Sequence, residues 1–298
     1  MRIIPPININ DTNLVSSNIV EDDQPPWLIN TTYSAGDKVV HVHKIYESIA
    51  GANAGNQPDI TPLKWLLLGA TNRFRAFDKL LSDQAERSDN ISYVIDNGGV
   101  GIDSVALFNL DAASVRVQVI DDIDGTVYDA TFALIDNTDI TNWSDYFFGP
   151  VGVTAKELVV TDVPPYGTAE TTVTITKTGS TAKVGQVVLG RVNPLGITVF
   201  GSTVSIEDFS RKERDAFGNA IIVQRAFAQL VDFDVKVTTP DVRRIQNTLA
   251  QFRTSPLVWL GSSDASYGTT IYGYYRRFDI TLNSPTLSDA SIEVEGLI

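Results

Sequence analysis

One segment of the chain, residues 240–253, has the pattern of an amphipathic α-helix. Thr239 suits the N-cap, Pro240 lacks the N–H that a first helical turn leaves unpaired, and Asp241 is favoured by the positive end of the helix dipole. Apolar residues then recur at spacings of three and four, which places four side chains on one face: Val242, Ile245, Leu249 and Phe252. The Ser-Pro pair at 255–256 ends the pattern. The sequence therefore predicts one long helix with its apolar face on a core.

The segments on both sides of this helix are predicted to be β-strands. Residues 227–237 precede it, and residues 257–260, 269–275 and 278–282 follow it, all rich in β-branched, aromatic or other apolar residues. One helix among these strands predicts an antiparallel sheet with a single flanking helix. Open edges of such a sheet carry unpaired N–H and C=O groups that can pair with a neighbouring copy. We therefore expect residues 196–298 to form a ring of identical copies.

Composition limits the classes of partner. A length of 298 residues with 43% hydrophobic residues suits two or three modules with real cores. The net charge of −13 disfavours nucleic acid and anionic membrane surfaces as partners. No apolar run approaches the roughly 20 residues of a membrane span, and the first residues lack the apolar core of a signal peptide. Cysteine is absent, which excludes disulfides and thiolate sites.

The chain before residue 196 divides into three regions. Residues 1–26 join a short apolar patch to polar residues, and we expect an N-terminal arm or edge strand that could pack on the C-terminal module. Residues 27–70 are rich in aromatic residues and glycine and form a candidate small β module. Residues 71–195 contain short alternating segments separated by turn signals such as Thr178-Gly179-Ser180, which predicts a β-sandwich of jelly-roll type. The whole chain is thus predicted to be mainly β.

The aromatic residues of the 27–70 module follow a recognisable order: Trp27, Tyr33, Tyr46 and Trp65, with Gly36-Asp37 between the first two and the last two. This order resembles the small chitin-binding modules of carbohydrate-binding families five and twelve. The resemblance implies that these four aromatic residues bind a sugar. Residues 47–53 contain no aromatic residue, however, where that family carries an exposed aromatic pair. The alternative interpretation is that the four residues form the core of the module.

A second aromatic cluster lies at residues 143–148. As a binding site, Trp143 and Tyr146 would offer stacking faces to a sugar ring, and Asp145 would accept hydrogen bonds from its hydroxyl groups. As structure, the same cluster would close one end of the sandwich. The sequence favours the structural interpretation and leaves the other open.

Candidate metal sites are weak. His41 and His43, two residues apart on a predicted strand, would share a face and could both reach a metal, with Asp37 in the preceding turn. An exposed strand face is the favoured interpretation. The acidic residues 121–124 before Gly125 lack the distal Glu and flanking helices of a calcium-binding EF-hand, so a hairpin turn is predicted there. We expect no metal and no cofactor.

Acid pairs are the remaining candidates for catalysis. Glu207 and Asp208 are adjacent on a predicted strand and face opposite sides, which does not suit the paired carboxylates of a glycosidase. Asp232 and Asp234 share a face and are expected to line a hydrophilic surface, such as a lumen. No catalytic residue is assigned and no enzyme activity is expected. A polysaccharide-binding protein, and less so a glycoside hydrolase, are the alternative functions.

Three further features complete a larger pattern: a charged hairpin tip at 211–219, an aromatic strand at 269–278 and an alternating C-terminal segment at 292–297. Together with the single helix, they resemble minor tail proteins of long-tailed bacteriophages, most of all distal-tail proteins. The resemblance implies a tail-tube-like β-barrel that forms a ring, with six copies favoured and three as the alternative. It also implies a peripheral jelly-roll or galectin-like sandwich and a place in the virion at the baseplate or tail tip, after assembly in the host cytoplasm.

The same resemblance implies partners. They would be further copies of the chain, the tail tube, hub and tape measure proteins, and polysaccharides of the host cell surface during attachment. Neither nucleic acid nor membrane insertion is expected.

Overall fold

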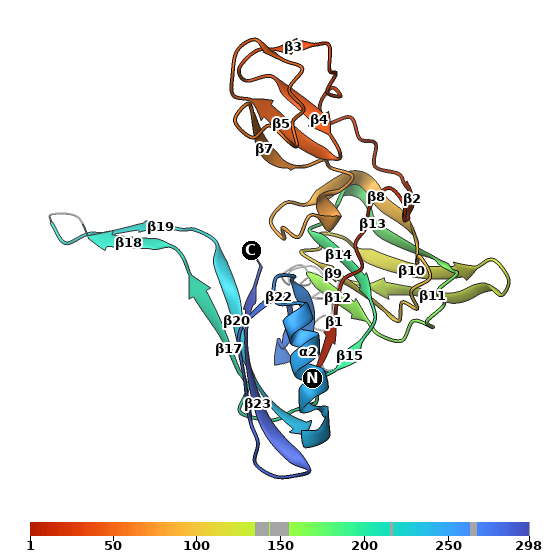
Figure 1. Cartoon of the computed structure of the whole chain (residues 1–298), viewed down its shortest axis with the longest axis vertical. Coiled ribbons are helices and arrows are strands. Elements are labelled where there is room, and N and C mark those ends of the chain that lie inside the picture. The colour runs from red at the N-terminus through yellow and green to blue at the C-terminus, as the bar shows by residue number, and fades with distance from the viewer. Residues whose placement is uncertain (135–142, 144–154, 215–216, 263–266, 298) are drawn as a thin grey trace.

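The computed structural model describes residues 1–134, 143, 155–214, 217–262 and 267–297. Strands dominate these residues, and one α-helix, α2 (Val242–Gln251), accompanies them together with two 3-10 turns, η1 (Arg75–Phe77) and η2 (Thr239–Asp241) (Figure 1). The predicted mainly β class is therefore confirmed. No helix among the described residues is long and apolar enough to cross a membrane.

Two sheets pack against each other in the region that follows the small module. One has the strand order β11-β10-β13-β8-β2 and the other β12-β9-β14. We call this part, residues 71–134 and 155–190 with β2, the two-sheet region. Its strands are β2 (Leu14–Ser17), β8 (Ala85–Asp96), β9 (Ser104–Phe108), β10 (Ser114–Asp121), β11 (Gly125–Ala133), β12 (Glu157–Val160), β13 (Glu170–Val184) and β14 (Gln186–Gly190).

The three-stranded sheet of this region is covered on both faces. Val105 and Leu107 of β9 pack into the large core shared with the five-stranded sheet. Ala106 and Phe108, which point the other way, pack with Tyr272 in a second cluster that belongs partly to the C-terminal sheet. Every residue of β9 is consequently buried. The three-stranded sheet is thus the middle of three layers.

The third layer is an eight-stranded antiparallel sheet with the path β15-β1-β21-β22-β23-β20-β16, in which β17 also pairs with β20. Its members are β1 (Arg2–Ile4), β15 (Asn193–Pro194), β16 (Ile197–Thr198), β17 (Thr203–Asp208), β20 (Phe227–Thr238), β21 (Leu257–Leu260), β22 (Thr270–Thr281) and β23 (Leu287–Gly296). The N-terminal strand pairs on both sides, so it lies inside this sheet rather than at an edge.

The two ends of this path are nearly joined through the chain. β15 and β16 lie at opposite ends of the path, yet only Leu195 and Gly196 separate them in sequence. Both linking residues donate backbone hydrogen bonds to the carbonyl of Met1, at 3.1 and 3.3 Å. A Cβ on Gly196 would come within 2.5 Å of the Lys236 carbonyl oxygen, so only glycine fits this close approach. The sheet is therefore strongly curved, and α2 packs against it (Figure 1).

The helix presents the predicted face to this sheet. Ile245 and Leu249 are buried, and Val242 and Phe252 pack partly buried against the same core. The helix starts later and ends earlier than the predicted 240–253, because η2 precedes it and Phe252 is already its C-cap. The predicted N-cap role of Thr239 is wrong: its hydroxyl donates to the Ser284 carbonyl at 2.8 Å and ties the helix start to the neighbouring loop.

The small module lies between β2 and β8 in the chain and projects from the two-sheet region (Figure 1). It contains a three-stranded sheet, β4-β5-β7, and a two-stranded sheet, β3-β6. The strands are β3 (Thr32–Tyr33), β4 (Lys38–His41), β5 (Lys44–Ser48), β6 (Asn53–Ala54) and β7 (Trp65–Ala70). A separate aromatic cluster forms its core.

One predicted turn is wrong. Thr178-Gly179-Ser180 was expected to separate two strands, but β13 continues through it from Glu170 to Val184. The pairing with β8 shifts register between Lys177 and Thr181, so the three residues form a bulge. The predicted Asp124-Gly125 turn is present between β10 and β11, with Gly125 at a positive φ of 74°.

Candidate interaction site

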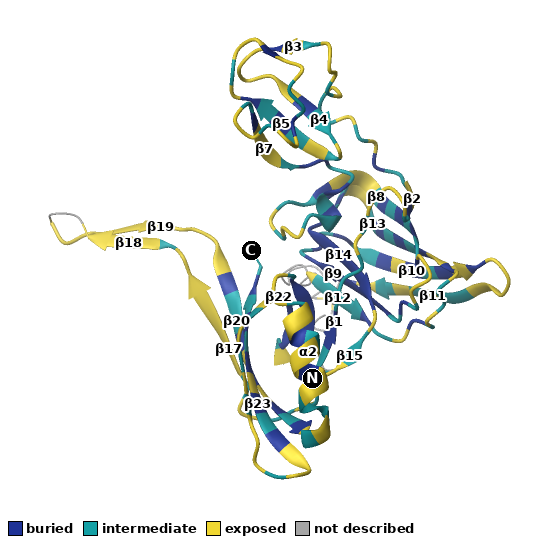
Figure 2. Ribbon diagram, viewed as in Figure 1, coloured by how far each residue is buried: buried dark blue, intermediate teal, exposed yellow. Residues whose placement is uncertain are grey.

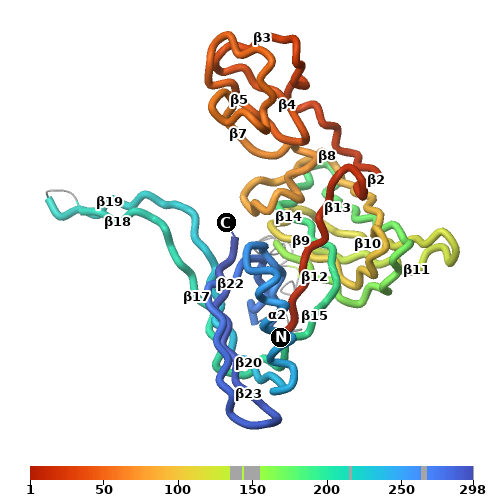
Figure 3. The backbone as a smooth tube through the Cα atoms, in the orientation of Figure 1, coloured from red at the N-terminus to blue at the C-terminus, as the bar shows by residue number. Residues whose placement is uncertain are grey.

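An exposed ribbon extends from the C-terminal sheet. β17 pairs with the first half of β20, and beyond them β18 (Arg211–Arg214) pairs with β19 (Ala220–Val223) as a separate two-stranded hairpin. We call residues 203–214 and 217–230 the arm. Figure 2 shows it almost entirely exposed, and Figure 3 shows its tip far from the rest of the backbone.

Hydrogen bonds, rather than packing, fix the junction between the two ribbons of the arm. The Asp208 carboxylate accepts from the Lys212 ammonium at 2.7 Å and from the Ser210 amide at 2.9 Å, and these bonds hold the pKa of Asp208 well below its usual range. Across the ribbon, the Ser210 hydroxyl accepts from the Arg225 amide at 3.0 Å. The outer hairpin is thus held in place although no described core covers it.

The inner ribbon of the arm, formed by β17 and the first half of β20, extends the apolar face of the sheet beyond the part that α2 covers. Val204 pairs with buried Val231. On the same face, Ile206 lies two residues further along β17 opposite Gln229, and Phe227 lies four residues from Val231 along β20 opposite Asp208. Ile206 and Phe227 are 66% and 58% exposed. A continuous face therefore runs from the core under α2 to a surface open to solvent. Large apolar side chains that are exposed next to a covered core mark a candidate interaction site.

The outer hairpin has apolar residues on both faces. Ile221 and Val223 point to one side of β19 and Ile222 to the other, and all three are exposed. The facing strand is charged, with Arg211 paired to Glu213 at 2.6 Å. Two strands alone are at best marginally stable in water. The composition and position of the hairpin therefore favour a partner that covers it.

The opposite face of the same sheet is charged. The Arg276 guanidinium of β22 lies 3.5 Å from the Glu295 carboxylate and 3.8 Å from the Glu293 carboxylate, both on the adjacent strand β23. It also lies 3.8 Å from the Glu207 carboxylate of β17. Asp232 and Asp234 alternate with buried residues of β20, so they share a solvent face as predicted. The side chains paired with Arg276 are between 19% and 44% exposed, and such partly exposed ion pairs add little stability. They make this side of the sheet a hydrated, mainly acidic surface.

Three of the four aromatic residues proposed to bind sugar are in the core of the small module. Tyr33, Tyr46 and Trp65 are buried, and Trp65 is only 2% exposed. The indole N–H of Trp65 donates to the Asn56 carbonyl at 2.8 Å, and the Tyr33 ring meets the indole edge at 5.2 Å. None of the three offers a free face to a sugar ring, because a module of this size uses its large aromatic residues for packing.

The other proposed sugar ligands differ from one another. Trp27 is half-buried with its ring at the edge of His41, 5.2 Å away. Trp143 is 78% exposed. Asp145 and Tyr146 lie outside the described residues, as does most of the predicted aromatic plug. The structure therefore brings no sugar-binding cluster together among the residues it describes.

The two histidines do not form a shared site. β4 ends at His41, while His43 lies in the following turn, so the two side chains are not on one strand face as predicted. His41 approaches Asp59 at 3.3 Å, and His43 contacts Asp11 and Glu21 instead. The described residues contain no group of three potential metal ligands. Asp121 accepts from the amides of the β10–β11 turn, which is a structural role.

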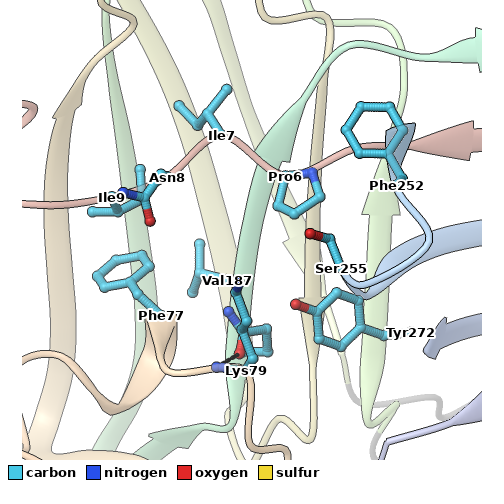
Figure 4. Close-up of a pocket in the computed structure, with 11 residues that line it drawn as sticks. Pro6, Ile7, Asn8, Ile9, Phe77, Lys79, Val187, Phe252, Ser255 and Tyr272 are labelled. Carbon is cyan, nitrogen blue, oxygen red and sulfur yellow. Dashed lines mark hydrogen bonds between the residues drawn. The ribbon is translucent and has the colours of Figure 1, made fainter. Parts of the chain in front are cut away.

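A small cavity of about 220 Å³ lies where the N-terminal segment, the two-sheet region and the end of α2 meet (Figure 4). The Tyr272 ring lines it and stacks on Phe108 at 5.5 Å, and the Tyr272 hydroxyl is buried with no hydrogen-bond partner among the described residues. Burial raises the pKa of this hydroxyl above its ordinary value. The cavity is smaller than the roughly 300 Å³ at which sites for organic ligands begin.

The exposure of the arm was not predicted. The sequence predicts the charged hairpin tip at 211–219. It does not predict exposure of Ile221, Ile222 and Val223, because these residues have the composition of a buried strand. The available signal was their pairing with a strand of four charged residues, because a strand of a closed core rarely faces such a neighbour. Comparison with protein-family models, with curated proteins and with solved structures finds no match to this chain.

Proposed function

We propose that the chain is a structural protein of a bacteriophage tail tip, of the distal-tail kind, which assembles into a ring of identical copies. The observation that supports this proposal is the arm. It extends the apolar face of a folded sheet beyond the helix α2 that covers this face, and it leaves Ile206, Phe227 and Ile222 exposed. A second copy of the chain is the partner that every such molecule has available.

The arm also favours a ring over a simple dimer. It projects from one end of the sheet, so its contact surface differs from the surface it would reach on a neighbour. Contacts between two different patches are heterologous, and repeated heterologous contacts close into rings when the rotation permits. Six copies are favoured by the resemblance to distal-tail proteins, and three are the alternative.

The curved eight-stranded sheet suits the inner part of such a ring. Its ends are joined through Leu195 and Gly196, which supports a tail-tube-like barrel. Its charged face, with Glu207, Glu293 and Glu295 around Arg276, would line the lumen and stay hydrated. An acidic lining repels a passing polyanion rather than binding it.

The two-sheet region and the small module would then lie at the periphery of the ring. The two-sheet region suits a jelly-roll or galectin-like sandwich, and either part could touch polysaccharides of the host surface. The burial of Tyr33, Tyr46 and Trp65 limits the small module to weak binding, in the millimolar range or about −4 kcal/mol. Several copies in one ring would multiply such weak contacts.

Electron microscopy of the purified chain and of tail tips from its source particle tests the proposal. We expect closed rings of six copies, with the sheet inside and the small module outside. Three copies would retain the proposal with its alternative symmetry. A monomer at high concentration, together with particles in which no ring of this chain can be traced, would refute it.

A further inference from the structure

The junction between the small module and the two-sheet region contains a histidine that both parts contact. His43 occupies the tip of the β4–β5 hairpin, where Val42 and His43 both have positive φ, at 47° and 59°. This turn directs the hairpin tip toward the two linkers that lead into and out of the module. The backbone amide of Thr71, in the outgoing linker, donates to the His43 carbonyl at 2.9 Å.

Both ring nitrogens of His43 face carboxylates. Nδ1 lies 3.0 Å from each Glu21 oxygen in the incoming linker, and Nε2 lies 2.7 Å from the Asp11 carboxylate in the loop before β2. The ring stacks on Phe74 beyond the outgoing linker, with centroids 3.9 Å apart. One side chain of the small module is thus connected to three separate segments outside it.

This geometry depends on the protonation state. A neutral imidazole has one N–H, so it can donate to Glu21 or to Asp11 but not to both, whereas an imidazolium donates from both nitrogens. We propose that His43 is a pH-dependent latch, which fixes the small module against the two-sheet region when its ring is charged and lets the module swing when the ring is neutral.

The other charged groups near the His43 ring interact with partners other than His43. Arg73 lies over the Phe74 ring at 5.9 Å, and Arg75 pairs with Asp83 at 3.1 Å and approaches Asp23 at 4.0 Å. Each cation near the junction therefore has its own contact. Burial lowers the pKa of His43. The hydrogen bonds that the ring makes to the Asp11 and Glu21 carboxylates raise it by more than burial lowers it, so the pKa is raised overall.

The direction of the pH effect follows from that shift. The contribution of the latch is fully present below the ordinary pKa of 6.5 and is lost as pH rises through the higher folded value. The hydrogen bonds of Thr71 to the His43 carbonyl and to Glu21 do not titrate with the ring. We therefore expect release to widen the range of module orientations, while the module itself stays folded.

The first test is an NMR titration of the imidazoles in the full chain, which has only two histidines. We expect His43 to titrate above 6.5, and its pKa to fall by about one unit in Glu21→Gln. Asp22→Asn is the matched control, because Asp22 is the adjacent, exposed carboxylate of the same linker. A His43 pKa at or below 6.5, or equal shifts in the two variants, would overturn the latch.

The second test measures orientation directly. The chain has no cysteine, so Leu63→Cys in the small module and Ile123→Cys in the two-sheet region, 86% and 90% exposed in the native chain, allow clean spin labelling. We expect a narrow distance distribution at about pH 5 and a broad one at about pH 8.5. In His43→Gln it should be broad at both. Distributions that respond neither to pH nor to His43→Gln would refute the proposal.

Discussion

Strand β9 and strand β19 are both short and apolar, yet their surroundings are opposite. Every residue of β9, Ser104–Phe108, is buried, because a sheet lies over each of its faces. Every residue of β19, Ala220–Val223, is exposed, because among the described residues it pairs with β18 alone in a two-stranded sheet. An apolar strand needs cover on both faces, and only for β9 does the chain supply it. The difference indicates that both faces of β9 are covered within this chain, one of them by the C-terminal sheet, whereas the arm is left uncovered.

The eight-stranded sheet contains both a covered and an uncovered stretch of apolar surface. Along β20, the residues Val231, Phe233 and Val235 lie under α2 and are buried. Phe227, on the same face but within the arm, is exposed. The helix therefore covers one part of the sheet and leaves the part in the arm exposed.

Removing the cover that α2 provides should have the largest effect. Leu249→Asp places a carboxylate in the core beneath the helix, where Leu249 is 1% exposed, and we expect a loss of about 4 kcal/mol or more. Urea unfolding followed by circular dichroism measures it. Asn247→Asp, at an exposed position of the same helix, is the control and should change stability by less than about 0.5 kcal/mol. Equal stability of both variants would show that α2 is not essential cover.

Truncation of the core of the small module should have the next largest effect on stability. Trp65→Ala removes the largest buried side chain of the module and should destabilise it by about 3–5 kcal/mol. Leu63→Ala, two residues earlier and 86% exposed, is the control. Limited proteolysis should cleave within residues 27–70 of the first variant only. If Trp65→Ala instead leaves the module folded and abolishes binding to chitin oligomers, then Trp65 is a sugar ligand and its buried position here is not the bound one.

A charged residue introduced in the arm should leave the stability of the fold unchanged and prevent assembly of the ring. Ile222→Asp alters a side chain that is 66% exposed, so we expect a change in unfolding free energy within about 0.5 kcal/mol. Analytical ultracentrifugation should show that the variant no longer self-associates. Leu107→Asp in β9 is the matched comparison and should fail to fold, because its side chain is fully buried. An Ile222→Asp protein that assembles like the wild type would remove the arm from the interface.

Local sequence signals predicted much of the fold. The helix face, the β10–β11 turn and most strand positions follow from periodicity and turn residues, which act within a few positions along the chain. The local pattern predicts a turn at Thr178-Gly179-Ser180, where the strand has a bulge, because glycine is common in both. The choice between them depends on the partner strand β8, which a local pattern does not contain.

The candidate site could not be predicted in the same way. Ile222 and Leu107 are both apolar residues in strands, and only the layers above and below them distinguish exposure from burial. Likewise, Trp65 has the position of a sugar ligand in its sequence pattern, but the fold uses it as core. The contacts of His43 with Asp11 and Glu21 join residues that are 32 and 22 positions apart. Such juxtapositions arise from tertiary packing alone.

The smallest effect is expected at Asp78, where the two-sheet region meets the C-terminal sheet. One carboxylate oxygen of Asp78 is buried without a partner among the described residues, while the other accepts from the Leu80 amide at 2.8 Å. Burial, helped by the nearby Asp83 carboxylate and opposed by Arg75, raises the pKa of Asp78 from 3.8 to about 6. The folded chain therefore binds this proton more tightly than the unfolded chain does, and ionised Asp78 opposes folding.

The raised pKa of Asp78 predicts how the stability of the chain depends on pH. Because the folded-state pKa is the higher one, the contribution of Asp78 to the unfolding free energy should rise as pH falls through about 6 and should stop rising below 3.8. Asp78→Asn removes the charge and should be more stable than the wild type at about pH 7, with the gap closing near pH 4. Asp96→Asn is the control, since Asp96 accepts from the Gly98 amide at 2.9 Å in the same local geometry. If both variants show the same pH dependence in urea unfolding, the contact between the two sheets at Asp78 is hydrated and the layers there are less closely packed than those around β9.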